Sequence, residues 1–249
     1  MAERVELAHG DDGEAGAASQ PRRPRLPFWA SLLVNVVVAI AVVAVVQALW
    51  VKVYSVPSGS MENTLEVGDR MLVNRTAYPD GMADSQDVVV FTANEDWATP
   101  ASSEGAVENA VRTFGDLTGI GRSHEQALVK RVVGTAGQTV ECCTAEGAVT
   151  VDGEPLDEPY IHNDLPFIRD ELDCESEVMS ARCFGPVTVP EDSMLVLGDH
   201  RSNSADSVIA CRGIPADQAG EDCARFVRDE DVVGEVFVTI WPPSNWGTH

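Results

Sequence analysis

An uncharged apolar segment of 24 residues constrains this 249-residue chain more than any other feature. Residues 28–51 read FWASLLVNVVVAIAVVAVVQALWV, and their only polar side chains are Ser31, Asn35 and Gln47. A helix rises about 1.5 Å per residue, so this segment is long enough to cross a hydrocarbon core of about 30 Å. A cleaved signal peptide is the alternative, but its apolar core runs over only about 7–15 residues. The sequence therefore predicts a retained transmembrane anchor at 28–51.

The residues on either side of this segment predict its orientation. Three arginines lie between residues 22 and 25, whereas only Lys52 lies close behind the segment. Because positive charge stays on the inner side, the N-terminus is expected to be cytoplasmic. Residues 1–27, rich in Gly, Ala, Asp and Glu and then in Pro and Arg, are expected to form a disordered cytoplasmic tail. Residues 52–249 are then an extracytoplasmic domain anchored to the cell membrane by a single span.

Charge and hydrophobic content narrow the class of protein. The net charge of −23 argues against a nucleic-acid partner, which demands a basic face. A hydrophobic content of 44% is too high for a disordered chain.

The exported part is expected to be mainly β. Its apolar, β-branched runs are short and are bounded by Gly, Pro, Asp or Asn, which is typical of strands. These runs are 69–75, 87–91, 127–133, 148–156, 193–199 and 232–241. Asp152-Gly153 inside one run predicts a tight hairpin, and apolar residues at helical spacing predict one amphipathic helix at about 105–118. The expected fold is a largely antiparallel, sheet-like or barrel-like domain with inserted loops.

All six cysteines lie in the exported part, where disulfides persist. Cys174–Cys183 and Cys211–Cys223 would each close a short loop and are favoured, but six cysteines allow fifteen connectivities, so the pairing stays open. No C-x₂-C pair is present, and for that reason a zinc site is not expected.

One lysine is out of keeping with the rest of the chain. The seventeen basic residues are fifteen Arg and two Lys, and Lys130 lies inside the apolar run ALVKRVV at 127–133. Burial can remove the proton from a lysine, whereas arginine stays protonated in proteins. Lys130 is therefore a candidate general base, and Ser60 in YSVPSGSMENTL is a candidate nucleophile for it. The alternative is a lysine whose stem covers the edge of a sheet.

A third segment, GDHRSNSADS at 198–207, is dense in hydroxyls and turn-forming residues. It can supply a hydroxyl that orients the lysine amine and a carboxylate–arginine pair that holds the loop, or it can be a plain polar turn. His200 within it leaves a Ser–His–Asp mechanism open as an alternative to Ser–Lys.

Taken together, PSGSMENTL, GDRMLVNR, KRVVGTAGQTV and GDHRSNSADS, in this order behind an anchor helix, resemble the bacterial type I signal peptidases. These are membrane-bound serine proteases with a Ser–Lys dyad. The resemblance implies that Ser60 is the nucleophile and Lys130 the general base, and that the Ser58 hydroxyl and the Ser60 backbone N–H form the oxyanion hole. It further implies that Ser204 hydrogen-bonds the Lys130 amine and that Asp206 braces the loop.

The same resemblance implies the substrate: an exported preprotein with small residues, such as Ala-x-Ala, before the cleaved bond. Seven residues are similar to the family's pocket-lining positions, with filling of a barrel core as the alternative role. They are Tyr54, Val56, Pro57, Met61, Leu65, Leu128 and Val129. No metal or cofactor is expected to take part in the reaction, and the oligomeric state is not predicted.

The chain also departs from the family pattern. Val208 stands where an arginine is expected after the SADS sequence, so Arg201 is the expected replacement partner of Asp206. Inserted segments are expected at about 93–125, 141–190 and 209–224, of which the first and last are expected to be loops near the site.

Two other classes of function stay open on the sequence. One is an inactive relative that binds exported segments without cutting them, although the presence of Ser60 together with Lys130 argues against it. The other is a self-cleaving regulator, which would need a cytoplasmic DNA-binding domain that a 27-residue tail cannot hold.

Overall fold

The computed structural model describes residues 27–79, 82–97, 126–220 and 222–249. The helix expected at 105–118, and most of the insertion expected at 93–125, lie outside these ranges. The chain divides into two units, Met1–Ile40 and Ala41–His249.

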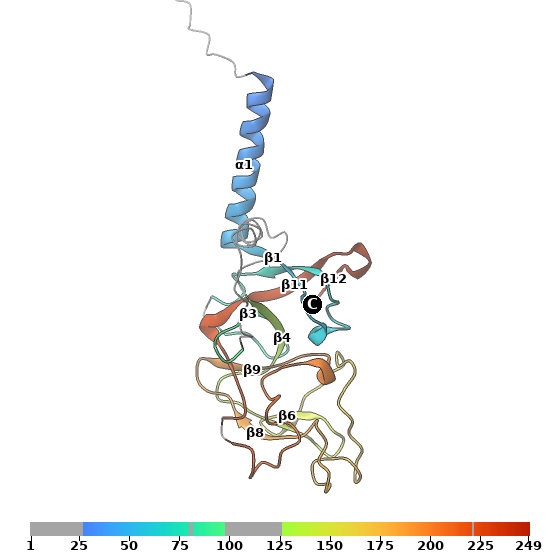
Figure 1. Ribbon diagram of the computed structural model, residues 1–249. Coiled ribbons are helices and arrows are strands. Elements are labelled where there is room, and N and C mark those ends of the chain that lie inside the picture. The colour runs from blue at the N-terminus through green and yellow to red at the C-terminus, as the bar shows by residue number, and fades with distance from the viewer. Residues whose placement is uncertain (1–26, 80–81, 98–125, 221) are drawn as a thin grey trace, which may run out of the picture. The chain divides into compact units, whose positions relative to one another are not determined.

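The only α-helix of the described ranges is α1, Phe28–Leu49 (Figure 1). Between Phe28 and Gln47 it is long and apolar enough to cross a membrane. Its large apolar side chains are exposed on all sides, as expected for a helix that needs apolar surroundings. The predicted span was two residues too long, because the helix ends at Leu49 and Val51 already begins a strand.

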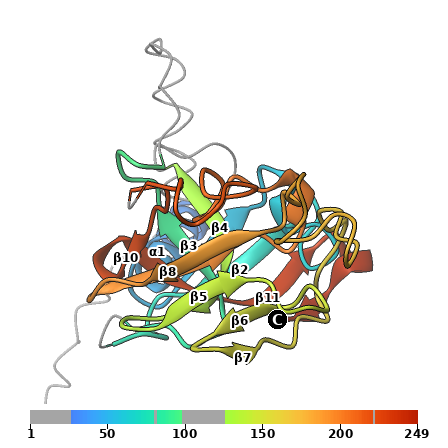
Figure 2. The ribbon, with the colours of Figure 1, turned by 90° about the horizontal axis from the view of Figure 1, so that it is seen from below.

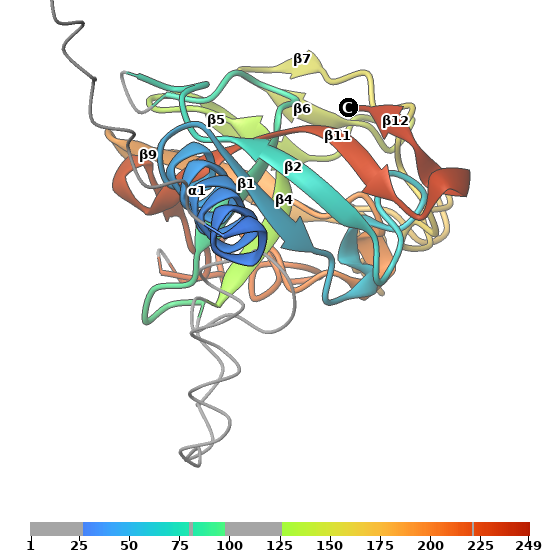
Figure 3. The same cartoon turned by 90° about the horizontal axis from the view of Figure 1, so that it is seen from above.

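An antiparallel sheet of eight strands forms the larger part of the domain, and Figure 3 shows several of its strands side by side. The strands follow the order β1-β2-β11-β3-β4-β9-β10, and β12 pairs with β11. Their bounds are β1 Val51–Ser55, β2 Arg70–Asn74, β3 Val88–Thr92, β4 Ala127–Gly134, β9 Ser193–Leu197, β10 Val227–Arg228, β11 Val232–Trp241 and β12 Gly247–Thr248.

A second, four-stranded sheet has the order β7-β6-β5-β8 (Figure 2). Its strands are β5 Thr139–Cys142, β6 Val149–Val151, β7 Glu154–Pro155 and β8 Phe184–Thr188. Most of this sheet lies within the insertion expected at 141–190, which is therefore not only loop. The predicted hairpin is confirmed: β6 and β7 are joined by Asp152 and Gly153, both with positive φ, as a type I′ turn requires.

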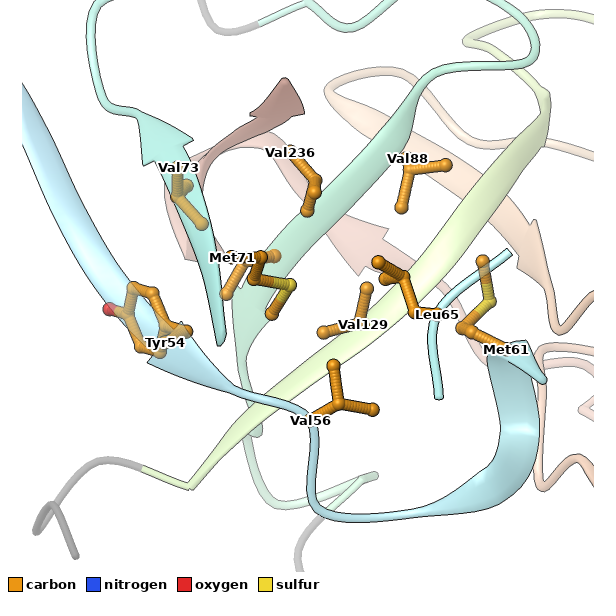
Figure 4. Close-up of a cluster of buried hydrophobic side chains, with 10 residues drawn as sticks. Tyr54, Val56, Met61, Leu65, Met71, Val73, Val88, Val129 and Val236 are labelled. Carbon is orange, nitrogen blue, oxygen red and sulfur yellow. The ribbon is translucent and has the colours of Figure 1, made fainter. Parts of the chain in front are cut away.

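Three clusters of buried apolar side chains hold the domain together. Valine dominates them because a β-branched side chain fits the pleated surface of a sheet. Figure 4 shows side chains of one cluster, from β1, β2, β3, β4 and β11 and from the segment after β1, pointing toward one another. Each such side chain stabilises the fold by about 1.5–3 kcal/mol when fully buried.

The mainly β fold class and all six predicted strand regions are confirmed. The strands β1, β5, β8, β10 and β12 were not predicted. Four short 3₁₀ turns complete the described elements: η1 Gly59–Met61, η2 Arg201–Asn203, η3 Asp229–Asp231 and η4 Pro243–Asn245.

The disulfides include both of the favoured pairs, Cys174–Cys183 and Cys211–Cys223. The remaining two cysteines, Cys142 and Cys143, are joined to each other.

Candidate active site

The lysine and the serine singled out in the sequence meet inside the domain. Lys130 on β4 places its Nζ 2.6 Å from the Oγ of Ser60 on η1, and 3.1 Å from the carbonyl oxygen of Val129. Only 4% of Lys130 and 6% of Ser60 is exposed. The two residues are 70 positions apart in the chain, so the sheet and the turn together create this contact.

Burial sets the charge of this lysine. It lowers the pKa of the Lys130 ammonium from 10.5 to about 8, because a charged group loses its hydration inside the protein. The carboxylates of Asp206 and Asp199 oppose this shift, and the cation of Arg225 adds to it. A substantial share of Lys130 is therefore a neutral amine near pH 8, able to accept the proton of Ser60.

The turn that carries Ser60 is held from both sides. Met61 and Leu65 are fully buried, and the Leu65 N–H donates to the Met61 carbonyl over 2.7 Å. From the other side, the backbone N–H of His200 donates to the Ser60 carbonyl over 3.1 Å. Gly198 permits this approach, because a Cβ there would lie 2.5 Å from the Ser60 carbonyl oxygen and 2.3 Å from Ser204 Oγ.

Two serines expected to assist the dyad take different positions. Ser58 is exposed and immediately precedes η1, and its side chain makes no capping hydrogen bond. Ser204 is buried, but its Oγ has no hydrogen-bond partner among the described residues. The expected bond from Ser204 to Lys130 is therefore not formed, and the amine instead contacts Ser60 and Val129.

The expected pairing of Arg201 with Asp206 was wrong. Arg201 forms a buried ion pair with Glu158 and donates from Nε to the Gly198 carbonyl over 3.0 Å. Asp206 pairs instead with Arg212, 3.2 Å away, and its backbone carbonyl accepts from Arg225 Nε over 3.1 Å.

Of the two arginines that contact Asp206, Arg212 follows Cys211 directly and Arg225 lies two residues after Cys223, so both lie close to the disulfide Cys211–Cys223. An arginine was expected at position 208 as the partner of Asp206, and the chain has a valine there. Arg212, in the segment 209–224 that was expected to be a loop near the site, pairs with Asp206 instead, and Arg225 directly after that segment also contacts it. Val208 itself is fully buried in an apolar cluster.

His200, the alternative base, is engaged elsewhere. Its Nδ1 lies 2.6 Å from Glu62 Oε2 and 3.1 Å from the Gly59 carbonyl oxygen. The side chain that reaches Ser60 Oγ is Lys130. This arrangement favours the Ser–Lys dyad over a Ser–His–Asp triad.

The sequence left open a carboxylate–arginine pair that holds the 198–207 segment, but it did not predict the pair of Arg131 with Asp199, which ties together three segments around the dyad. Arg131 binds the Asp199 carboxylate through both Nε and Nη2, at 2.9 and 2.6 Å. Thr64 Oγ1 donates to the same carboxylate over 2.5 Å, and Arg131 lies 3.9 Å over the ring of Tyr160. A basic residue directly beside Lys130 in an apolar strand was the available signal, because such a side chain needs a buried acidic partner.

The residues expected to line a pocket divide into three groups. Five of them lie in the cluster of Figure 4: Tyr54, Val56, Met61, Leu65 and Val129. Leu128 packs against another cluster, since neighbouring residues of a strand point to opposite faces. Pro57 is exposed. The alternative role, core filling, applies to the five, and their contact with a substrate stays a prediction.

Comparison with known proteins now places the chain. Residues 29–241 match the family model described as signal peptidase, peptidase S26. The chain belongs to this family. Signal peptidase I of Mycobacterium tuberculosis (strain CDC 1551 / Oshkosh) is 34% identical over an alignment that covers 95% of this chain and 80% of that protein. A probable signal peptidase I of Mycobacterium leprae (strain TN) is 33% identical over 92% of this chain and 81% of that protein.

These matches confirm the resemblance drawn from the sequence, together with the enzyme class that it implied, a serine endopeptidase of the signal peptidase I type. A crystal structure of a signal peptidase I from Enterococcus faecalis V583 is 20% identical to the chain, with a TM-score of 0.32, and covers 62% of this chain and 97% of that one.

Proposed function

We propose that this member of the family cleaves signal peptides from exported preproteins with Ser60 as nucleophile and Lys130 as general base. The observation that carries the proposal is the contact of 2.6 Å between a buried lysine amine and a serine hydroxyl. The lowered pKa of Lys130, about 8, supports it, because a base must be neutral to accept a proton.

The reaction proceeds through an acyl-enzyme. Neutral Lys130 takes the proton of Ser60 as Oγ attacks the scissile carbonyl, and the lysine ammonium then gives that proton to the leaving amine. Water next attacks the ester and loses a proton to Lys130, and the proton returns to Ser60 as the acid leaves. The Ser60 N–H and the exposed Ser58 hydroxyl bind the oxyanion, each donor contributing about 3–4 kcal/mol.

A free strand edge beside the dyad supports binding of an extended substrate. β4 pairs with β9 only from Arg131 to Gly134, so residues 127–130 lack a strand partner on that side among the described ranges. The C-terminal part of a signal peptide pairs along this edge, which directs its scissile bond toward Ser60. We expect the substrate to carry small residues such as Ala-x-Ala before the cleaved bond, as the family resemblance implies.

The apolar helix α1 holds the enzyme in the membrane as a single span, with the N-terminus cytoplasmic and the peptidase domain outside. A membrane-bound substrate meets the site at raised effective concentration, because both partners are held at one surface.

Cleavage of a preprotein with an Ala-x-Ala site by the detergent-solubilised full chain tests the proposal. We expect Ser60→Ala and Lys130→Arg to reduce kcat/KM by at least about 10⁴-fold, as loss of a nucleophile or its base does in serine proteases. The matched control is Lys52→Arg, the same change at the only other lysine of the chain, which is expected to cleave normally.

Thermal unfolding establishes that each variant is folded. If folded Lys130→Arg cleaves at the wild-type rate, Lys130 is not the base, and His200 becomes the next candidate. If the wild type binds preproteins but cleaves none, the protein is a binding module.

A further inference from the structure

A cluster of two histidines and a glutamate lies next to the Ser60 turn, and the proposed mechanism does not use it. Glu62 follows η1 directly, His200 follows β9, and His162 lies in the segment between β7 and β8. One potential ligand atom from each residue lies within 4.8 Å of the other two. We propose that Glu62, His162 and His200 form a binding site for one divalent transition-metal ion of the zinc type.

The donor set suits this ion. Imidazole nitrogen and carboxylate oxygen bind Zn²⁺ at about 2.0–2.2 Å, so tetrahedral ligand atoms lie about 3.3–3.5 Å apart. The closest pair here, His200 Nδ1 and Glu62 Oε2, lies at 2.6 Å and shares a proton. A metal ion replaces that proton and moves the two atoms slightly apart, while the remaining ligand moves inward. Three protein ligands leave a fourth position for water.

The backbone brings the three ligands together without help from a metal. The His162 N–H donates to the Asp199 carbonyl over 2.8 Å, which fixes the His162 segment beside His200. The His200 N–H donates to the Ser60 carbonyl over 3.1 Å, which fixes the His200 segment beside the turn that leads to Glu62. Such pre-organisation favours metal binding, since little order remains to be created when the ion arrives.

Both histidines present nitrogens suited to coordination. The amide nitrogen of Asn163, which can only donate, lies 2.9 Å from His162 Nε2, so Nε2 carries no proton and its electron pair accepts this hydrogen bond. A metal ion bound at Nε2 takes the place of the Asn163 donor. The rings of His162 and His200 meet edge to face, with their centroids 5.2 Å apart. His200 is mostly buried, whereas His162 and Glu62 are half-buried, which leaves an entry path for the ion.

The sequence does not predict this site, because its three ligands are not part of a C-x₂-C or other short metal-binding motif. The three residues are far apart in the chain, and only the fold brings them together.

Isothermal titration of the full chain with Zn²⁺ alone tests the proposal. The protein is stripped with a chelator, carries no polyhistidine tag and is kept free of reductant, because all six cysteines are then paired and thiolates do not compete. We expect one Zn²⁺ per chain, with visible absorption of tetrahedral type when Co²⁺ replaces it.

His162→Gln, His200→Gln and Glu62→Gln are each expected to weaken Zn²⁺ binding by at least about tenfold. Two controls remove the other histidines of the chain: His249→Gln alone, and His9→Gln with His124→Gln. Both controls are expected to bind as the wild type does.

His162→Gln carries the decision if the buried His200 variant fails to fold, because His162 is half-buried. Absence of stoichiometric binding overturns the proposal, and so does binding that His162→Gln leaves unchanged or that either control abolishes. The test reads binding and not cleavage, so its outcome is independent of the proposed peptidase function.

Discussion

Lys130 and Arg201 are two basic residues buried to nearly the same extent in one domain, with 4% and 3% of each exposed. Lys130 has a hydroxyl and a carbonyl as its acceptors. Arg201 has the buried Glu158 carboxylate and the carbonyl of Gly198. Burial lowers the pKa of Lys130 to about 8. Burial alone would lower the pKa of Arg201 too, but the charge and hydrogen bonds of Glu158 outweigh it, so that pKa is raised.

The difference shows that burial alone does not decide in which direction the pKa of a basic group shifts in this protein. The Glu158 carboxylate, in direct contact, compensates the buried charge of Arg201, which stays protonated, and Arg201 serves as a structural link between Glu158 and the Gly198 backbone. Lys130 has no carboxylate in direct contact among the described residues, and burial lowers its pKa to about 8. A buried basic side chain thus has a structural role where its partner is a carboxylate, as at Arg201, and the proposed catalytic role where its partners are uncharged, as at Lys130.

Arg201→Met gives the largest expected loss of stability. It leaves the Glu158 carboxylate, whose side chain is only 5% exposed, without its partner. Removing one member of a buried ion pair costs about 3–5 kcal/mol. Urea unfolding at pH 7 measures this loss, and Arg228→Met, at an exposed arginine, is the control. A loss below about 1 kcal/mol would show that the Arg201–Glu158 pair is not the structural element described here.

The same substitution at Lys130 is expected to have the opposite sign. The pKa of Lys130 is lower in the folded protein, about 8, than its ordinary value of 10.5. Below pH 8 both states are protonated and the folded state bears the full cost of the buried charge. Between pH 8 and 10.5 the unfolded state binds more protons, so wild-type stability rises with pH, by up to about 3 kcal/mol.

Lys130→Met lacks this rise and is expected to be more stable than the wild type at pH 7, by up to about 3 kcal/mol. Urea unfolding of both proteins at pH 7 and pH 10 measures it, with Lys52→Met as the matched control. If Lys130→Met is less stable than the wild type at pH 7, and if the stability of both proteins changes equally between pH 7 and pH 10, Lys130 is held as a charged structural group like Arg201.

Arg225→Gln is expected to have the smallest effect. Arg225 is one of the charges that lower the pKa of Lys130, whereas Asp206 raises it. Removal of this cation therefore raises the pKa of Lys130, and the ascending limb of the pH profile of kcat/KM moves to higher pH. The shift is a fraction of a pH unit, because Arg225 is partly exposed and solvent screens its charge. A limb that moves to lower pH would contradict the stated role of Arg225.

The sequence predicted the elements whose signal is local. β2, β3, β4, β9 and β11 are runs of β-branched residues bounded by turn formers, and the Asp152-Gly153 hairpin is encoded by two residues. β1 was missed because the apolar segment runs directly into it: Val51, the first residue of the strand, was taken as the last residue of the anchor. β5 and β8 were missed because they are short and carry Cys142 or Pro186.

The residues of the site also divide into those with a local sequence signal and those without one. The pairing of Lys130 with Ser60, seen as a contact of 2.6 Å, was predicted because a lysine inside an apolar strand is unusual in this arginine-rich chain and because the family resemblance placed Ser60 opposite it. The partner of Asp206 was not, because Arg212 reaches it from a segment closed by the disulfide Cys211–Cys223, and no spacing rule encodes that return. The unpaired hydroxyl of Ser204 and the direction of the His200 ring likewise depend on packing between segments far apart in sequence.

The pH dependence of kcat/KM for cleavage by the full-length wild type tests the central claim most directly, because it reports the ionisation of the free enzyme's base. If neutral Lys130 is the base, kcat/KM rises with pH through a single ascending limb with a midpoint near pH 8, the pKa of the buried Lys130. The same limb should persist in His200→Gln. A midpoint near that of an ordinary lysine, about 10.4, would contradict the account, as would a limb that disappears when His200 is replaced.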